Sequence, residues 1–195
     1  MDTPPEPGAQ QVPPPESRYA DELARLAEVG GPRPPGWLLT PSAVVSFVCG
    51  NARLGVSRKF VGDPALVERC VITLAGERAL LLVGEPGTAK SMLSELLAAA
   101  ICGTSGLTVQ GSAGTTEDQL RYGWNYAQLL ARGPSEDALV PSPVLAAMRS
   151  GRVARVEEIT RCLRCRTPSS PCSPSGASRC PNWASTPSTP PPVSA

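Results

Sequence analysis

The chain has 195 residues, enough for one ordinary domain and a tail but not for two full domains. Its formal net charge is +1, so no global field attracts nucleic acid or an acidic membrane surface. It has no histidine, which excludes Ser–His and Cys–His catalytic pairs and any metal site with a histidine ligand. No apolar run approaches the roughly 18–20 residues that span a bilayer, and no secretory signal is recognisable. With its seven cysteines expected as free thiols, we expect a cytoplasmic protein.

Composition divides the chain into three parts. Residues 1–36 form a proline-rich arm that holds nine of the 23 prolines, residues 37–163 have a globular pattern, and residues 164–195 are rich in proline, serine and cysteine. We expect the last part, and most of the first, to be disordered, because proline removes backbone donors and fixes φ.

One short helix is predicted within the arm. Ser17 is a candidate N-cap, Tyr19, Leu23 and Leu26 recur at helical spacing, and Gly30 is a stop signal. Asp21 and Arg25 are spaced to attract each other along this helix. We expect the arm to dock on the main domain.

Strand and helix patterns alternate through the middle region. Helices are predicted to open at Thr40-Pro41, at Pro64 and at Thr116, and to cover residues 90–101 and 144–148. Strands are predicted at residues 79–83, 107–110 and 152–156, and the first lacks alternation, as is typical of a strand buried on both faces. The alternation predicts βαβ units, and therefore an α/β fold with a parallel sheet.

A glycine-rich loop lies between the predicted strand 79–83 and the predicted helix 90–101. It reads Gly84-Glu85-Pro86-Gly87-Thr88-Ala89-Lys90-Ser91. Two glycines let such a loop point successive N–H groups at one anion, and the following helix adds its partial positive charge. Lys90 is placed to reach the β- and γ-phosphates of a nucleotide, and Ser91 to place its hydroxyl on Mg²⁺. Ala89 stands where glycine is most common, so a simple glycine-proline turn remains the alternative.

Two glutamates end the third predicted strand, 67 residues beyond Lys90. A nucleotide hydrolase needs one carboxylate for Mg²⁺ and another for the attacking water, both at the carboxyl edge of the sheet. We assign Glu157 to the Mg²⁺ side and Glu158 to the water. The alternative is an ordinary charged strand end, and Arg155 inside the strand departs slightly from the pattern.

With the loop and the acidic strand end in this order, the chain resembles a MoxR-type AAA+ ATPase. The resemblance covers about residues 59–163, the first half of that family's ATPase module. Lys59-Phe60-Val61-Gly62 is similar to the segment near which adenine lies, and alanine before the lysine is common in the family. Residues 156–161 are similar to its Walker B stretch, with Glu157 in place of the usual aspartate.

The resemblance implies a P-loop NTPase-like (AAA+) fold with a three-layer parallel sheet, incomplete in this chain. It implies ATP and Mg²⁺ as cofactors, with Lys90 and Glu158 catalytic and Ser91 and Glu157 holding Mg²⁺ through water. The residues expected to bind the nucleotide are Gly84, Glu85, Pro86, Gly87, Thr88, Ala89, Lys90, Ser91 and Met92. The family's members hydrolyse ATP as rings, usually hexamers, and remodel client proteins, often beside a partner with a von Willebrand factor A domain. No nucleic acid or membrane partner is implied.

The family continues with two more strands, a sensor residue, an arginine finger and a helical lid, which residues 164–195 do not resemble. We therefore expect a tail that is read out of frame, with a truncated, non-enzymatic fragment that binds nucleotide weakly or not at all as the alternative function. In the family's sheet the fourth strand lies between the first and the third. Its absence predicts exposed apolar edges at those strands and marginal stability.

Two weaker features leave alternatives open. Tyr122, Trp124 and Tyr126 are spaced either to grip a client at a ring pore or, more ordinarily, to pack on one face. The tail has one Cys-x-x-Cys pair and two further cysteines, which makes a zinc site a minor alternative. The cysteines outside the tail are expected in the core; they are Cys49, Cys70 and Cys102.

Overall fold

The computed structural model describes residues 12–76, 78–116, 120–135 and 138–161. Its helices are α1 (Pro15–Arg18), α2 (Ala20–Ala27), α3 (Pro41–Cys49), α4 (Pro64–Ala75), α5 (Lys90–Cys102), α7 (Tyr126–Arg132) and α8 (Pro143–Ser150), with 3₁₀ turns η1 (Ala52–Leu54) and η3 (Ile159–Arg161). Its strands are β1 (Thr108–Gln110), β2 (Tyr122–Trp124), β3 (Leu139–Pro141) and β4 (Arg155–Glu157). The helices opening at Thr40-Pro41 and Pro64, and the one at residues 90–101, are confirmed.

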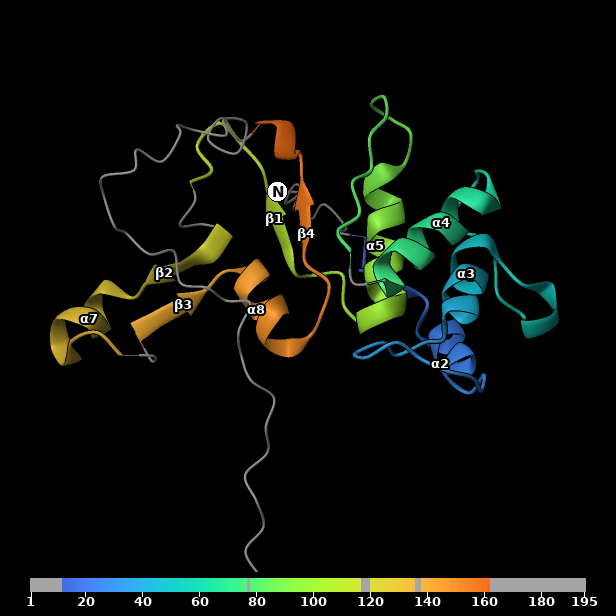
Figure 1. Cartoon of the computed structure of the whole chain (residues 1–195), viewed down its shortest axis with the longest axis horizontal. Coiled ribbons are helices and arrows are strands. Elements are labelled where there is room, and N and C mark those ends of the chain that lie inside the picture. Colours follow the sequence, from blue (N-terminus) through green and yellow to red (C-terminus); the bar gives the residue numbers. More distant parts are fainter. Residues whose placement is uncertain (1–11, 77, 117–119, 136–137, 162–195) are drawn as a thin grey trace, which may run out of the picture.

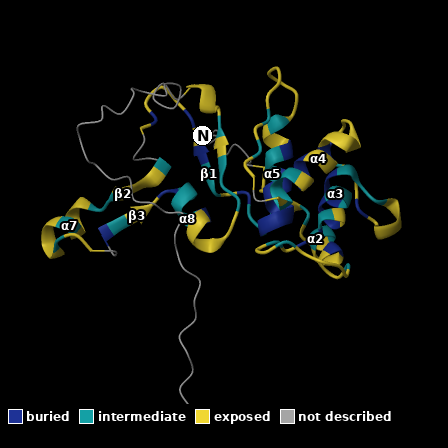
Figure 2. Cartoon of the chain, viewed as in Figure 1, coloured by how far each residue is buried: buried dark blue, intermediate teal, exposed yellow. Residues whose placement is uncertain are grey.

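The largest core lies between α3, α4 and α5, which pack side by side (Figure 1). Proline opens α3 and α4 at the first turn, where its missing N–H costs nothing, and the side chains of Thr40 and Asp63 cap them. The buried residues gather on these helices, and those of α5 are almost all apolar over its last two turns (Figure 2). This core supports the start of α5, where the glycine-rich loop ends.

The arm docks on this core, as the sequence predicts, although its local details differ. Leu26 is fully buried, and the Tyr19 ring meets the Phe47 ring edge-on, with centroids 5.9 Å apart. Ser17 is not an N-cap but lies inside α1, which Pro15 opens, so regular structure begins earlier than expected. Helix α2 ends at Ala27, before Gly30, and Arg25 donates to the Gly55 carbonyl, 3.0 Å away.

The parallel sheet consists of β1 and β4, with Thr108 opposite Arg155 and Gln110 opposite Glu157. Helix α5 contacts β4 and helix α8 contacts β1, so the strands lie between helices (Figure 1). The strands predicted at residues 107–110 and 152–156 are both present: β1 lies within residues 107–110, whereas β4 begins three residues later than predicted and ends one residue later, at Glu157. The α/β class is confirmed. The parallel sheet expected at the centre of a three-layer fold is small and incomplete in the described residues.

The strand predicted at residues 79–83 is the main correction. This segment belongs to no strand of the structure. Leu80 and Leu82 pack against the helical core, but Leu81 and Val83 are 71% and 84% exposed. The segment therefore buries one face instead of two. Its apolar composition fits a central strand, and none of the described residues pairs with its backbone as a neighbouring strand.

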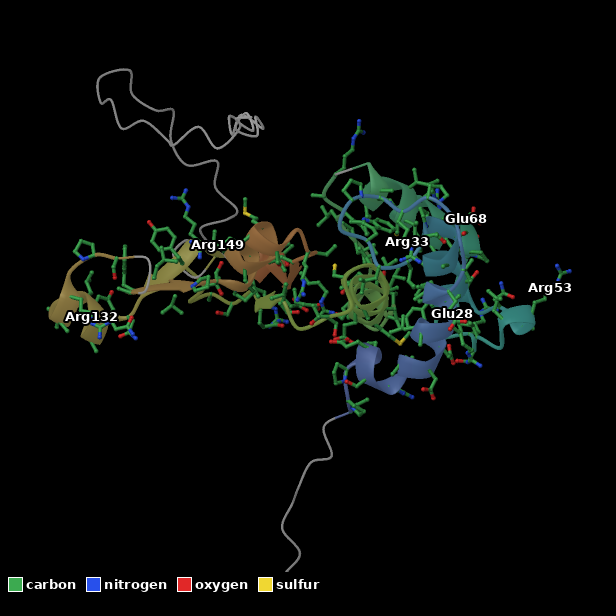
Figure 3. The ribbon with its side chains drawn as sticks, turned by 90° about the horizontal axis from the view of Figure 1, so that it is seen from below. Glu28, Arg33, Arg53, Glu68, Arg132 and Arg149 are labelled. Carbon is green, nitrogen blue, oxygen red and sulfur yellow. The ribbon has the colours of Figure 1, made fainter. Side chains whose placement is uncertain are left out.

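A second, antiparallel pair extends away from the core. Strands β2 and β3 pair and carry α7 between them, and this unit is mostly exposed (Figures 1 and 2). Tyr122 and Trp124 share a face of β2 with ring centroids 5.8 Å apart, whereas Tyr126 lies in α7 and is 71% exposed. The first two rings therefore contact each other, although Tyr122 is itself 39% exposed, and no packing is seen for the third among the described residues. Arg132 points outward at the far end, opposite the end that carries Arg53 (Figure 3).

Several expectations lie partly or wholly outside the described residues. They are the helix opening at Thr116, of which residues 117–119 are not described, the disorder expected in most of residues 1–36, and the tail at 164–195 with its zinc alternative. Over the ranges that the structure does describe, no helix is both long and apolar enough to cross a bilayer.

Candidate functional site

The glycine-rich loop folds around the ammonium group of Lys90. Lys90 Nζ donates to the carbonyls of Gly84 and Glu85, at 2.9 and 2.6 Å, and lies 3.2 Å from Thr88 Oγ1. Thr88 Oγ1 in turn donates to the Glu85 carbonyl at 2.8 Å. Residues 83–89 are exposed, so the loop opens to solvent. The positive charge of Lys90 therefore lies in an accessible loop. Its partners there are uncharged carbonyl and hydroxyl oxygens, which an anion can replace.

The start of α5 has the features that favour an anion. Its N-cap, Ala89, has φ 58° and ψ 25°, and no side chain caps the first turn. The first N–H groups of a helix have no partner within the helix, and the helix dipole favours a negative charge there. The left-handed conformation of Ala89 also explains why glycine is common at this position, since a Cβ is strained there. The loop thus keeps the required geometry in spite of the alanine.

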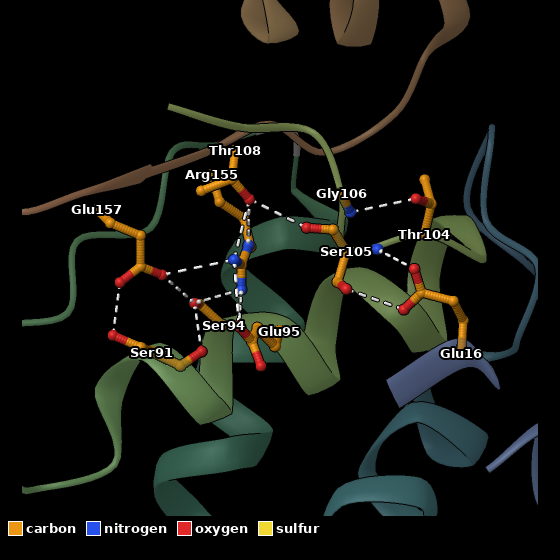
Figure 4. A network of polar contacts seen from close by, with 10 residues as sticks. All are labelled: Glu16, Ser91, Ser94, Glu95, Thr104, Ser105, Gly106, Thr108, Arg155 and Glu157. Atoms are coloured by element: carbon orange, nitrogen blue, oxygen red, sulfur yellow. Dashed lines mark hydrogen bonds and ion pairs between the residues drawn. The ribbon is translucent and has the colours of Figure 1, made fainter. Parts of the chain in front are cut away.

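Glu157 and Ser91 meet across the site, 66 residues apart in sequence (Figure 4). Ser91 Oγ donates to Glu157 Oε2 at 2.5 Å, and Ser94 Oγ donates to Oε1 at 3.2 Å. Parallel strands end at a common edge of the sheet, and β4 delivers Glu157 to that edge beside the first turn of α5. The structure therefore brings together the two residues that we assigned to Mg²⁺.

Glu158 lies differently. It has φ 52°, so the chain turns sharply at the end of β4 and sends the two glutamates in different directions. Its Oε2 accepts from Arg161 Nε at 3.0 Å, and both side chains are exposed. Among the described residues, Glu158 is bonded to Arg161 and not to the loop. A strained residue at this point is typical of functional sites, where surrounding structure must hold it.

The donor set fits Mg²⁺. This ion prefers oxygen ligands and is commonly held by one or two carboxylates together with substrate phosphates and water. The Ser91 hydroxyl and the Glu157 carboxylate, in contact beside the glycine-rich loop, supply such oxygen ligands. Where the structure describes the chain, it places no three histidine, cysteine, aspartate or glutamate side chains close enough to form an all-protein metal site.

The sequence pattern does not reveal the polar surroundings of Glu157. Ser94 and Arg155 contact its carboxylate, and Thr108 contacts Arg155. All three belong to one polar network with Glu157 (Figure 4). The alternation of strand residues was the available signal, because Arg155 and Glu157 lie two apart and share a face.

Lys59, the other lysine of the chain, contacts the arm and not the glycine-rich loop. The side chain of Lys59 is 2% exposed and pairs with Glu22 of α2, and its Nζ also donates to the Phe47 carbonyl at 3.1 Å. It lies 4.6 and 4.3 Å from the ring centroids of Tyr19 and Phe47. Lys59 therefore fastens the arm to the helical core.

The described cysteines behave as core residues. Cys70 and Cys102 are buried and Cys49 is half-buried. Burial raises the pKa of all three thiols above its ordinary value, which keeps them protonated and unreactive at neutral pH.

Loop, helix start and acidic strand end together form the candidate functional site. Comparison with known proteins gives an independent indication of its class. Residues 79–167 match the AAA domain family (dynein-related subfamily), which supports an AAA+ ATPase with a P-loop NTPase fold. The chain is also 56% identical over 144 residues to the "Uncharacterized protein YehL" of Escherichia coli (strain K12). That alignment covers 73% of this chain but only 40% of the relative's length, and no solved structure matches.

Proposed function

We propose that this chain binds Mg²⁺-ATP at residues 84–92 and contributes to its hydrolysis as part of a MoxR-type AAA+ machine. The observation that supports this most directly is the 2.5 Å contact between Ser91 Oγ and Glu157 Oε2. Two residues so far apart in sequence meet beside an anion-binding helix start, in the arrangement that phosphoryl chemistry requires.

Each residue has a defined role in this proposal. Lys90 leaves the loop carbonyls and binds the β- and γ-phosphates, beside the N–H groups of the loop and of α5. Ser91 and Glu157 hold the metal, directly or through water. Bound Mg²⁺ would neutralise charge on the phosphate oxygens. Glu158 orients a water and accepts its proton as the water oxygen bonds to the γ-phosphorus, and the bond to the β-phosphate oxygen breaks to leave ADP and phosphate.

The finer parts of the proposal rest on the family resemblance. We propose that the protein assembles as a ring, in the cytoplasm, with adenine near residues 59–62, and that it remodels client proteins beside a partner with a von Willebrand factor A domain. The chain spans 40% of the length of the curated relative it matches.

Nucleotide-dependent melting tests the binding site. A ligand that binds only the folded state raises the free energy of unfolding by mass action, by about 2.7 kcal/mol at a hundredfold excess over Kd, and therefore raises the melting temperature. Mg²⁺-ATP should stabilise the parent chain, and Lys90→Ala should abolish the effect. Arg53→Ala removes the same charge in the 3₁₀ turn η1, outside the loop and α5, and should leave the shift intact. Equal shifts in the parent and in Lys90→Ala would exclude this loop as the site.

Turnover tests Glu158 separately from binding. Glu158→Gln should keep the Mg²⁺-ATP shift but lose about 10²- to 10⁴-fold in hydrolysis, the usual contribution of a positioned acid or base. A parent chain that binds without turning over ATP would support the alternative of a non-enzymatic fragment.

A further inference from the structure

Arg155 is an unusual residue for a strand enclosed between helices. Its side chain is 9% exposed, and arginine is rarely buried without partners. Its guanidinium donates to Thr108 Oγ1 from Nη2 and Nε, at 2.9 and 3.2 Å. It also reaches Ser94 Oγ at 3.4 Å and Glu95 Oε1, 3.4 Å from Nη1. Each of the three guanidinium nitrogens therefore has an oxygen partner.

The register of the sheet explains this placement. Arg155 lies opposite Thr108 in the β1–β4 ladder, so the neighbouring strand supplies the hydroxyl that fixes the guanidinium. Arg155 and Glu157 lie two residues apart and share the face toward α5, where Ser91, Ser94 and Glu95 are found (Figure 4). The strand thus presents a cation and a carboxylate side by side to the same helix.

The two carboxylate oxygens of Glu157 have different partners. Oε1 lies 3.7 Å from Arg155 Nη2 and 3.2 Å from Ser94 Oγ, whereas Oε2 lies 2.5 Å from Ser91 Oγ. Oε1 is therefore on the side of Arg155, and Oε2 is on the side of Ser91 and the loop. Glutamate has one more rotatable bond than aspartate and loses more conformational freedom when it is fixed.

We propose that Arg155 is a positioning residue for the metal-side carboxylate: it anchors Glu157 Oε1, so that Oε2 is presented to Ser91 and to Mg²⁺. This proposal rests on the proposed function. It explains how the chain uses a glutamate at a position where the longer side chain could otherwise turn away. Arg155 itself touches neither nucleotide nor metal.

The test is a Mg²⁺ titration of ATP-dependent stabilisation in the full chain. Arg155→Met keeps an unbranched apolar stem and removes the charge and the donors. It should raise the Mg²⁺ concentration at half-maximal stabilisation by about tenfold, the usual effect of losing an outer-shell partner of a metal ligand. Arg155→Lys should restore part of the loss. A double variant, Arg155→Met with Glu157→Asp, should titrate closer to the parent than Arg155→Met, because the shorter carboxylate needs no anchor.

Three results would overturn the proposal. An unchanged midpoint in a folded Arg155→Met variant would show that the anchor is not needed, and a lower midpoint would show that the arginine competes with the metal for Glu157. A lysine variant as impaired as the methionine variant, with the double variant no better, would show a purely structural role. If Arg155→Met does not fold, Thr108→Val removes two of the guanidinium's hydrogen bonds, and an unchanged midpoint there overturns the proposal equally.

The same titration separates the two proposals. If the parent chain and Lys90→Ala both fail to respond to Mg²⁺-ATP, the proposed function is wrong and the role of Arg155 falls with it. If the parent responds and Arg155→Met responds identically, the proposed function stands and only the positioning role fails.

Discussion

Ser91 Oγ and Glu157 Oε2 lie 2.5 Å apart, while Ser94, one turn along the same helix, meets the other oxygen of that carboxylate at 3.2 Å. The two serines share a residue type, a helix and a partner, but only Ser91 lies at the mouth of the loop. They therefore form a matched pair for separating metal binding from simple support of Glu157.

Ser91→Ala should remove most of the Mg²⁺-dependent part of the ATP-induced rise in melting temperature, whereas Ser94→Ala should retain it. The two serines differ in position. The hydroxyl of Ser91 is a proposed metal ligand, whereas the hydroxyl of Ser94 contacts only the other oxygen of the Glu157 carboxylate. Thermal melts of both variants with ATP in Mg²⁺ or in excess chelator measure the difference. Equal losses in the two variants would mean that the hydroxyl of Ser91 does not contact the metal.

The left-handed conformation of Ala89 gives a prediction about stability. An L-residue with a Cβ costs roughly 1–2 kcal/mol in this region relative to its ordinary conformation, and glycine avoids the cost. Ala89→Gly should therefore stabilise the ligand-free chain by about 0.5–1 kcal/mol, after the greater freedom of glycine in the unfolded chain is subtracted. Denaturant unfolding measures this change.

Ala98→Gly is the matched control, because Ala98 lies inside α5 in ordinary helical conformation. There the same substitution should destabilise by about 1 kcal/mol or more. Destabilisation of similar size at both positions would show that Ala89 is not held in the left-handed region in solution.

Much of this site could be predicted from local sequence. The loop, the helix that begins at Lys90 and the end of β4 at Glu157 each carry a pattern within a few residues: glycines, a lysine before an apolar helix, and acids after an apolar run. Their mutual approach followed from the rule that parallel strands end at one edge of the sheet.

What could not be predicted depends on partners distant in sequence. Residues 79–83 are composed as a buried strand, but a strand needs a paired neighbour, and its backbone pairs with none of the described strands. The burial of Lys59 depends on Glu22 and on the Tyr19 ring, 37 and 40 residues earlier, and no periodicity within the segment reports that contact. The role of Arg155 cannot be predicted for the same reason, since Thr108 supplies its acceptor from another strand.

The pair formed by Glu22 and Lys59 makes the docking of the arm depend on pH. Burial alone raises the pKa of Glu22, but the hydrogen bonds from Lys59 and Ser57 and the charge of Lys59 lower it overall, below its ordinary value of 4.5. A group with a lowered folded-state pKa stabilises the fold above its unfolded pKa, and this contribution is lost as the pH falls through the folded value. Glu22→Gln should cost about 2 kcal/mol at pH 7, and the gap to the parent should close as the pH falls below 4.5 and through the lowered folded-state pKa of Glu22.

Unfolding free energies of parent and variant over that pH range provide the measurement. The double variant Glu22→Leu with Lys59→Met is the control, because replacing a buried ion pair by apolar side chains is often neutral, while removing one partner strands the other. It should be more stable than Glu22→Gln at pH 7. A gap that stays constant with pH would show that Glu22 is not ionised against Lys59.

The segment 79–83 predicts how the isolated chain behaves in solution. Leu81 and Val83 are exposed on an extended backbone, which is a template for pairing with another chain. We therefore expect the chain to self-associate at high concentration.

Leu81→Lys with Val83→Lys should reduce this association, since inserted charges oppose edge pairing. The cost in stability should stay within about 0.5 kcal/mol, as for exposed positions generally. Leu80→Lys with Leu82→Lys makes the same change on the face packed against the core, and should unfold the segment and increase association. Light scattering against concentration, together with thermal melts, distinguishes the two faces, and equal behaviour of both double variants would mean that the segment does not present one face to solvent.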